Sequence, residues 1–162
     1  MERSFSSDLD LELDLSFTGA SRDVLEQLSD QSSRSFLTEA ESWEKDIRGW
    51  IQFIRSDETF TCPELVRRTL LVSMGLQFID DSDIAALNSS WRQKPDKTDV
   101  LSFPVFDEKI ALPQEQFVEL GDIVVSLPTA EQQAKEQNHS LVKELRWLVS
   151  HGLLHLLGWD HP

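Results

Sequence analysis

Three of the four histidines of this chain fall within one short stretch, at His151, His155 and His161. His151 and His155 are four residues apart, so on a helix their imidazoles project from one face, one turn apart. Gly158 can end that helix and turn the chain so that His161 offers a third nitrogen. Three histidine ligands with a fourth position open to water form the arrangement of a catalytic zinc site. The spacing therefore predicts one Zn²⁺ ion held by these histidines.

Two other interpretations of the histidines are open. They could be ordinary core residues, but each buried imidazole on an apolar helix would then need its own polar partner. The spacing also matches the metzincin zinc peptidases. Those enzymes need a glutamate general base directly after the first histidine, where this chain has Gly152. Glycine inside a helix lowers helix stability by about 1 kcal/mol relative to alanine. We therefore expect another segment to approach the backbone of Gly152 or to need the space that a side chain would fill.

The histidines must be positioned by the surrounding helices and strands, which hydrophobic periodicity locates. Leucines alternate with acidic residues over 9–17, which predicts a strand with one wet, acidic face. Residues 140–157 are apolar nearly all round and predict a helix buried within the fold. Strands alternating with helices indicate an α/β or α+β fold with a small sheet of about four strands. The other expected strands are 74–78, 99–103 and 121–127, and the other expected helices are 22–28, 36–54, 63–71, 82–91 (capped by Ser82) and 128–138.

The charge balance limits the possible partners. The chain has 15 basic and 29 acidic residues, a net charge of -14, which argues against loose binding to DNA, RNA or an anionic membrane. An enzyme with a local basic entrance is compatible with this charge, because Arg92, Lys94 and Lys97 lie close together. Cys62 is the only cysteine, and the acidic N-terminal stretch does not match a signal peptide. These features predict a cytoplasmic protein without disulfides.

Several motifs together resemble the bacterial YbeY family, over roughly residues 60–162. Three segments match, in family order. The first consists of LNSSWR at 87–92 and KTDVLSFP at 97–104, the second is LGDIVVS at 120–126, and the third is HGLLHLLGWDH at 151–161. The resemblance implies an α+β fold, with a small mixed sheet packed with about five or six helices and the metal-binding helix buried centrally. We expect a single metal-hydrolase domain over 1–162.

The resemblance also implies a function. Family membership would make the chain a zinc-dependent endoribonuclease, specific for single strands, acting in ribosomal RNA (16S) maturation and ribosome quality control. Its partners would be single-stranded regions of ribosomal RNA, with ribosomal proteins or the small subunit as further candidates, and neither DNA nor a membrane. The family's zinc ligands would correspond to His151, His155 and His161. Its functionally critical arginine would correspond to Arg92, whose guanidinium suits the charge on phosphoryl oxygens.

The chain departs from the family pattern in two places. The segment 29–50 is longer than the family pattern leads us to expect, and we interpret it as a possible insertion. The sequence stops at Pro162, where family members usually continue into a C-terminal helix. Two alternative functions remain open: a metal-stabilised ribosome-assembly factor without nuclease activity, and a metzincin-like zinc peptidase.

Two further residues have an expected structural role. Trp91 is expected to pack rather than to stack on bases. Asp122 is expected to cap a strand end rather than to orient a metal-bound histidine. No residue can be assigned as the general base.

Overall fold

Helices and strands succeed one another along the computed structural model, which describes residues 11–29, 34–94, 96–107 and 117–159. In chain order the elements are β1 (Glu12–Thr18), α1 (Arg22–Glu26), α2 (Arg34–Thr38), α3 (Glu41–Ser56), α4 (Glu64–Arg68), β2 (Leu71–Ile79), α5 (Asp81–Arg92), β3 (Val100–Pro104), β4 (Phe117–Ser126), α6 (Leu127–Glu136) and α7 (Leu141–Leu156).

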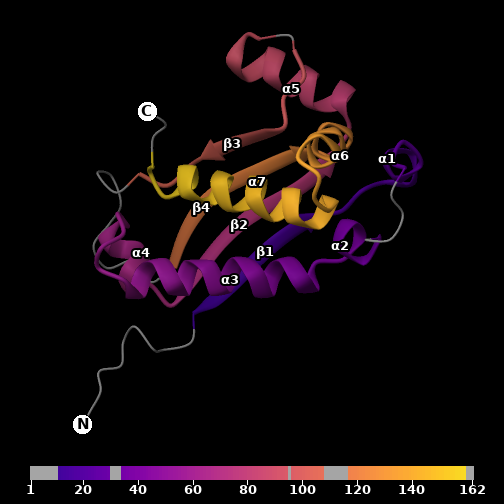
Figure 1. The fold of residues 1–162 in the computed structure, drawn as a ribbon. Coiled ribbons are helices and arrows are strands. Elements are labelled where there is room, and N and C mark those ends of the chain that lie inside the picture. Colours follow the sequence, from indigo (N-terminus) through magenta and orange to yellow (C-terminus); the bar gives the residue numbers. More distant parts are fainter. Residues whose placement is uncertain (1–10, 30–33, 95, 108–116, 160–162) are drawn as a thin grey trace.

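The strands form one sheet in the order β1-β2-β4-β3 (Figure 1). β1, β2 and β4 are parallel, and β3 pairs antiparallel with β4. Parallel neighbours require a crossover connection, and helices α1 to α4 lie in the segment that joins β1 to β2. A mixed sheet of four strands packed with helices confirms the predicted α+β class.

One face of the sheet is covered and the other is largely open. In β1, Leu13, Leu15 and Phe17 pack against the core, whereas the alternating Asp14 and Ser16 are exposed. This is the period-two pattern expected from the sequence, with its acidic face in solvent.

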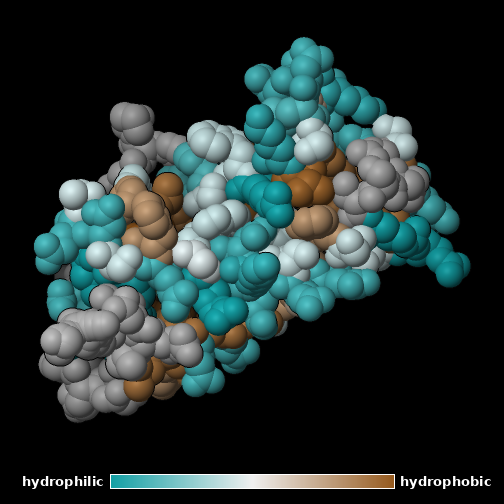
Figure 2. Space-filling model, turned by 60° about the horizontal axis from the view of Figure 1, so that its bottom comes forward, coloured by the Kyte–Doolittle hydropathy of each residue, from teal (hydrophilic) through white to brown (hydrophobic). Residues whose placement is uncertain are grey.

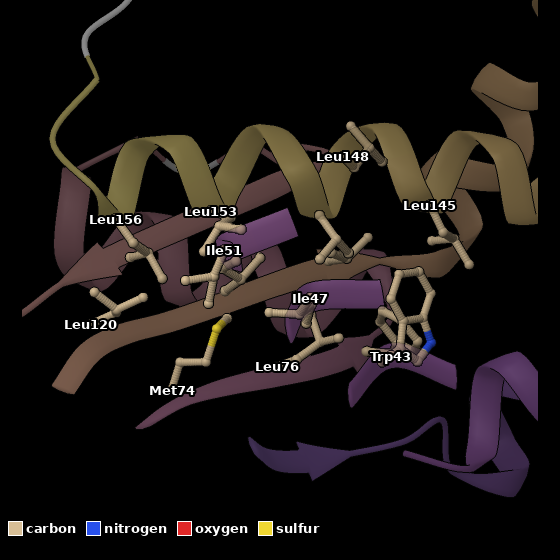
Figure 3. Close-up of a cluster of buried hydrophobic side chains, with 14 of the residues drawn as sticks. Trp43, Ile47, Ile51, Met74, Leu76, Leu120, Leu145, Leu148, Leu153 and Leu156 are labelled. Atoms are coloured by element: carbon tan, nitrogen blue, oxygen red, sulfur yellow. The ribbon is translucent and has the colours of Figure 1, made fainter. Parts of the chain in front are cut away.

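Helices α3 and α7 lie over the covered face (Figure 1). Side chains of both helices meet those of β2 and β4 in one hydrophobic cluster (Figure 3). The labelled members of this cluster are Trp43, Ile47, Ile51, Met74, Leu76, Leu120, Leu145, Leu148, Leu153 and Leu156.

Helix α7 is buried on one side only. Ser140 caps its first turn, with Oγ accepting a hydrogen bond from the Lys143 backbone N–H at 3.1 Å. On its outer side Trp147 is 65% exposed, and Arg146 Nε lies 3.0 Å from Asp46 of α3. The central helix is therefore packed across the sheet, and not enclosed all round as its composition predicted.

Within the described ranges, no helix is long and apolar enough to cross a membrane.

The expected helix 36–54 is divided into α2 and α3, and the cause is tertiary. The carbonyl oxygen of Leu37 accepts a hydrogen bond from the Ala20 N–H at 2.8 Å, and that of Phe36 accepts one from Trp43 Nε1 at 2.7 Å. Both carbonyls therefore accept hydrogen bonds from groups other than the backbone N–H four residues further along a regular helix. Because of this division, the described residues contain seven helical segments instead of the expected five or six.

The cap predicted for the helix after β2 was wrong by two residues. Asp80, not Ser82, is the N-cap of α5, since its Oδ1 accepts a hydrogen bond from the Asp83 N–H at 2.9 Å. Helix α5 then packs on the open face of the sheet, but only at one end. Ile79, Ile84, Leu101 and Val124 form a small second core there.

Most of the surface is hydrophilic in the view of Figure 2, where hydrophobic side chains emerge in separate small patches. Two large apolar side chains among the exposed ones, Trp91 and Trp147, each line a cavity next to the β3 edge strand.

Candidate active site

The last helix brings two of the predicted ligands together. The rings of His151 and His155 lie with centroids 4.9 Å apart and nearly perpendicular to each other, at 77°. Both residues are half-buried. Gly158 follows with φ of +100°, and its N–H donates to the His155 carbonyl at 3.0 Å. Glycine tolerates this φ value, so the helix ends there as the sequence indicates. His161 lies outside the described residues.

The two histidines line a cavity of about 740 Å³, which we call the histidine cavity. Arg92 comes to it from α5, and Trp147 comes from the same helix as the histidines. Its lining residues are Arg92, Asp99, Val100, Ser102, Pro104, Phe106, Trp147, Leu148, His151, His155, Leu156, Gly158 and Trp159. The fold therefore brings Arg92 to the same cavity as the histidine pair, although some 60 residues separate them in the chain.

The position of Arg92 is set by the end of α5. The next residue, Gln93, adopts the left-handed conformation with φ of 58°, and its N–H returns to the Ser89 carbonyl at 3.2 Å. Asn88 Nδ2 also donates to the Asp96 carbonyl at 2.9 Å, which ties the following loop back to the helix. Arg92 is thus presented from the last turn of a capped helix.

The other end of α5 is anchored by a charged network. Burial raises the pKa of Asp81, but hydrogen bonds from Ser126, Thr129 and Lys97 outweigh it and leave that pKa below its usual value. The ionised carboxylate lies 3.3 Å from Lys97 Nζ. These contacts hold the start of α5 against the end of β4. Together with the Asn88–Asp96 hydrogen bond at its other end, they fix both ends of the helix that carries Arg92.

An aromatic side chain that the sequence reading missed borders the histidine pair. The Trp147 ring stacks on the His151 ring at 6.2 Å between centroids, with 24° between the planes. Trp147 precedes His151 by four residues, and that spacing could have revealed the contact, because helical residues at i and i+4 are neighbours. The Trp147 ring therefore lies beside the His151 imidazole at the cavity.

Three other residues, His139, Asp122 and Trp91, do not line the histidine cavity. His139 Nε2 lies 2.6 Å from Glu144 Oε1, and His139 lines neither of the two cavities beside β3. Asp122 is a mid-strand residue of β4 and does not cap a strand end. Trp91 packs edge to face against Phe103, as expected, but 69% of it stays exposed.

The residues present fit a metal ion of the predicted kind. Neutral imidazoles one helical turn apart are the nitrogen donors that zinc prefers, and this pair faces a cavity open to water. Within the described part of the chain, no group of three His, Cys, Asp or Glu side chains is placed to hold an ion. The third ligand predicted by the sequence, His161, lies outside that part.

Gly152 is packed directly against the sheet. A Cβ atom at this position would lie 3.0 Å from Ile123 Cγ2 and 3.2 Å from Ser102 Oγ. This confirms the expectation that a neighbouring segment needs the space. Gly152 does not line the histidine cavity, so its side of the helix faces the sheet and not the site.

Gly152→Glu should therefore unfold or strongly destabilise the protein without creating a peptidase, even though it completes the metzincin pattern. The added carboxylate would enter the interface between α7 and the sheet, where an unpaired charge costs about 3 kcal/mol or more. Thermal melting and a casein cleavage assay measure the two effects. Gly49→Glu is a matched control, because a Cβ at that exposed helical position meets nothing within 4 Å. Equal melting temperatures for the two variants, or peptide turnover by Gly152→Glu, would contradict the assignment.

The fold and the site together define a class of protein. A small mixed α+β sheet supports a helix that presents two imidazoles to a cavity lined by an arginine. Paired imidazoles and a guanidinium are the groups of a hydrolase that acts on an anionic substrate.

Comparison with known proteins identifies the family within that class. The family model described as "Endoribonuclease YbeY" matches residues 27–162. An endoribonuclease YbeY of Prochlorococcus marinus strain MIT 9313 is 54% identical over 97% of this chain and 84% of its own length. Another, from Synechococcus sp. strain CC9311, is 52% identical over 93% of this chain and 85% of its own length. The chain belongs to the YbeY endoribonuclease family, as its motifs indicated.

A solved structure supports the fold. The solution structure of a Thermotoga maritima protein matches 91% of this chain and 75% of its own length, with a TM-score of 0.52 and 24% sequence identity. At that identity the likeness bears on the fold alone.

Proposed function

We propose that this chain is a zinc-dependent endoribonuclease that cleaves single-stranded regions of ribosomal RNA during its maturation, in the cytoplasm. The observation that carries the proposal is that His151, His155 and Arg92 line one cavity of about 740 Å³. Membership of a family named for endoribonuclease activity supports the reaction. Ribosomal proteins or the small ribosomal subunit are the further partners we propose.

Within this proposal, the chain's own residues bind and orient the substrate. Arg92 is placed to hold a phosphoryl oxygen of the RNA with its planar guanidinium, which stabilises the negative charge that develops during phosphodiester cleavage. Trp147 stacks beside the His151 ring and lines the same cavity. When bound by the histidines, a zinc ion would supply an activated water near neutral pH and polarise the phosphoryl group.

The direct test is cleavage of a labelled single-stranded RNA by the purified protein. We expect cleavage with zinc present, loss of it after chelation, and recovery on adding zinc back. A duplex of the same sequence should resist cleavage. RNA binding without any turnover under these conditions would contradict the proposal and favour the assembly-factor alternative.

A further inference from the structure

A second cavity lies on the other side of β3, on the open face of the sheet. Its volume is about 800 Å³, within the range of sites for small organic groups. The residues that matter for its chemistry are Thr18, Gln77, Trp91, Arg92, Phe103 and Asp122. Arg92 lines both this sheet-face cavity and the histidine cavity, so the two cavities adjoin at this residue.

An aromatic wall bounds the sheet-face cavity. Trp91 of α5 lies 5.8 Å from the Phe103 ring of β3, edge to face at 65°. Trp91 is nonetheless 69% exposed, so most of its surface is available to a ligand. Flat aromatic surfaces beside a cationic group are how proteins bind unpaired bases of single strands.

The floor of the cavity is polar and carries an acid. Asp122 is the cross-strand partner of Phe103 on one side and of Gly75 on the other. The Asp122 carboxylate extends over Gly75, since a Cβ added there would clash with Asp122 Oδ1. A carboxylate repels phosphate but accepts hydrogen bonds from the exocyclic amino group of a base. The charge pattern therefore suits a base in the cavity and a phosphate beside Arg92.

We propose that the sheet-face cavity binds one unpaired nucleobase of the RNA strand, stacked on Trp91 with its amino edge toward Asp122. Arg92 then holds the phosphate that joins the nucleotide carrying this base to the nucleotide in the histidine cavity. The inference rests on the proposed function in taking RNA as the ligand. It adds a base-binding subsite next to the phosphate that Arg92 holds.

Trp91→Ala tests the aromatic wall. We expect it to weaken binding of a fluorescein-labelled single-stranded RNA about tenfold, the scale of losing one base–aromatic stack. Single-turnover cleavage at subsaturating protein should fall by a similar factor, because less of the RNA is bound. Trp91→Phe should restore most of the affinity. The readouts are fluorescence anisotropy with chelator present and single-turnover cleavage with zinc.

Phe53→Ala is the matched control, because Phe53 is also a largely exposed aromatic residue, at 60%, but lines neither cavity. It should leave affinity unchanged. Parent affinity in Trp91→Ala, or an equal loss in Phe53→Ala, would overturn the subsite while leaving RNA cleavage intact. Binding that depends on Trp91 without any cleavage would support the subsite and refute the proposed nuclease activity.

Asp122→Ala tests the base edge. The parent protein should bind a run of cytosines about fivefold more tightly than a run of uracils, because uracil lacks an exocyclic amino group. The variant should lose that preference and keep its affinity for uracil. Equal binding of the two runs by the parent, or an unchanged preference in the variant, would refute the role of Asp122.

Discussion

His155→Ala should release the metal and abolish RNA cleavage together. The imidazole supplies one of the proposed ligands, and its ring lies 4.9 Å from that of His151. A bound metal contributes several kcal/mol of transition-state stabilisation, which corresponds to a rate loss of about a thousandfold or more. Elemental analysis of the purified variant and single-turnover cleavage measure both effects. One equivalent of zinc in the parent should fall to almost none.

His139→Ala is the control for this experiment. It also removes an imidazole, but one that pairs with Glu144 away from both cavities. It should lower the melting temperature, because buried Glu144 loses its partner, and should retain the metal. If His155→Ala still held stoichiometric zinc, the metal site would have to be assigned to other residues.

Arg92→Ala should lower RNA cleavage by about a hundredfold with the fold and the metal intact. That is the scale of removing one group that stabilises charge in the transition state. The residue is exposed at the end of α5, and surface substitutions usually change stability by less than about 0.5 kcal/mol. Arg92→Lys should recover only part of the rate, because an ammonium keeps the charge but lacks the planar fork. Single-turnover rates beside a thermal melt and a zinc assay separate these effects.

Arg22→Ala supplies the comparison, since Arg22 is another exposed arginine that lines neither cavity. It should cleave at the parent rate. Cleavage by Arg92→Ala at that same rate would remove Arg92 from the chemistry. RNA binding would then be the remaining role of the basic segment, as in the assembly-factor alternative.

Local spacing was enough to predict much of the scaffold. The alternating leucines of β1 indicated a strand with one wet face, and Ser140 indicated the start of α7. The i and i+4 spacing of His151 and His155 placed two imidazoles on one side of that helix. Gly152 indicated a close approach, and the sheet provides it. These features depend on residues a few positions apart, for which helix and strand geometry alone decide the arrangement.

The sequence alone did not determine what depends on contacts between distant segments. The break between α2 and α3 follows from the Ala20 N–H, which takes the Leu37 carbonyl out of the helical ladder. Exposure of Trp91 follows from the limited area of sheet that α5 covers. An apolar residue in a helix or an acid in a strand has two possible environments, because periodicity defines faces but not what covers them.

The sharing of Arg92 between two cavities is the clearest case. Its place in a basic segment was visible in the sequence, but its position beside β3 depends on where α5 packs. That packing joins Ile84 of α5 to Leu101 of β3 and Val124 of β4. Only after these segments, distant in the chain, have come together does Arg92 line one cavity with the histidines and another with Trp91 and Asp122.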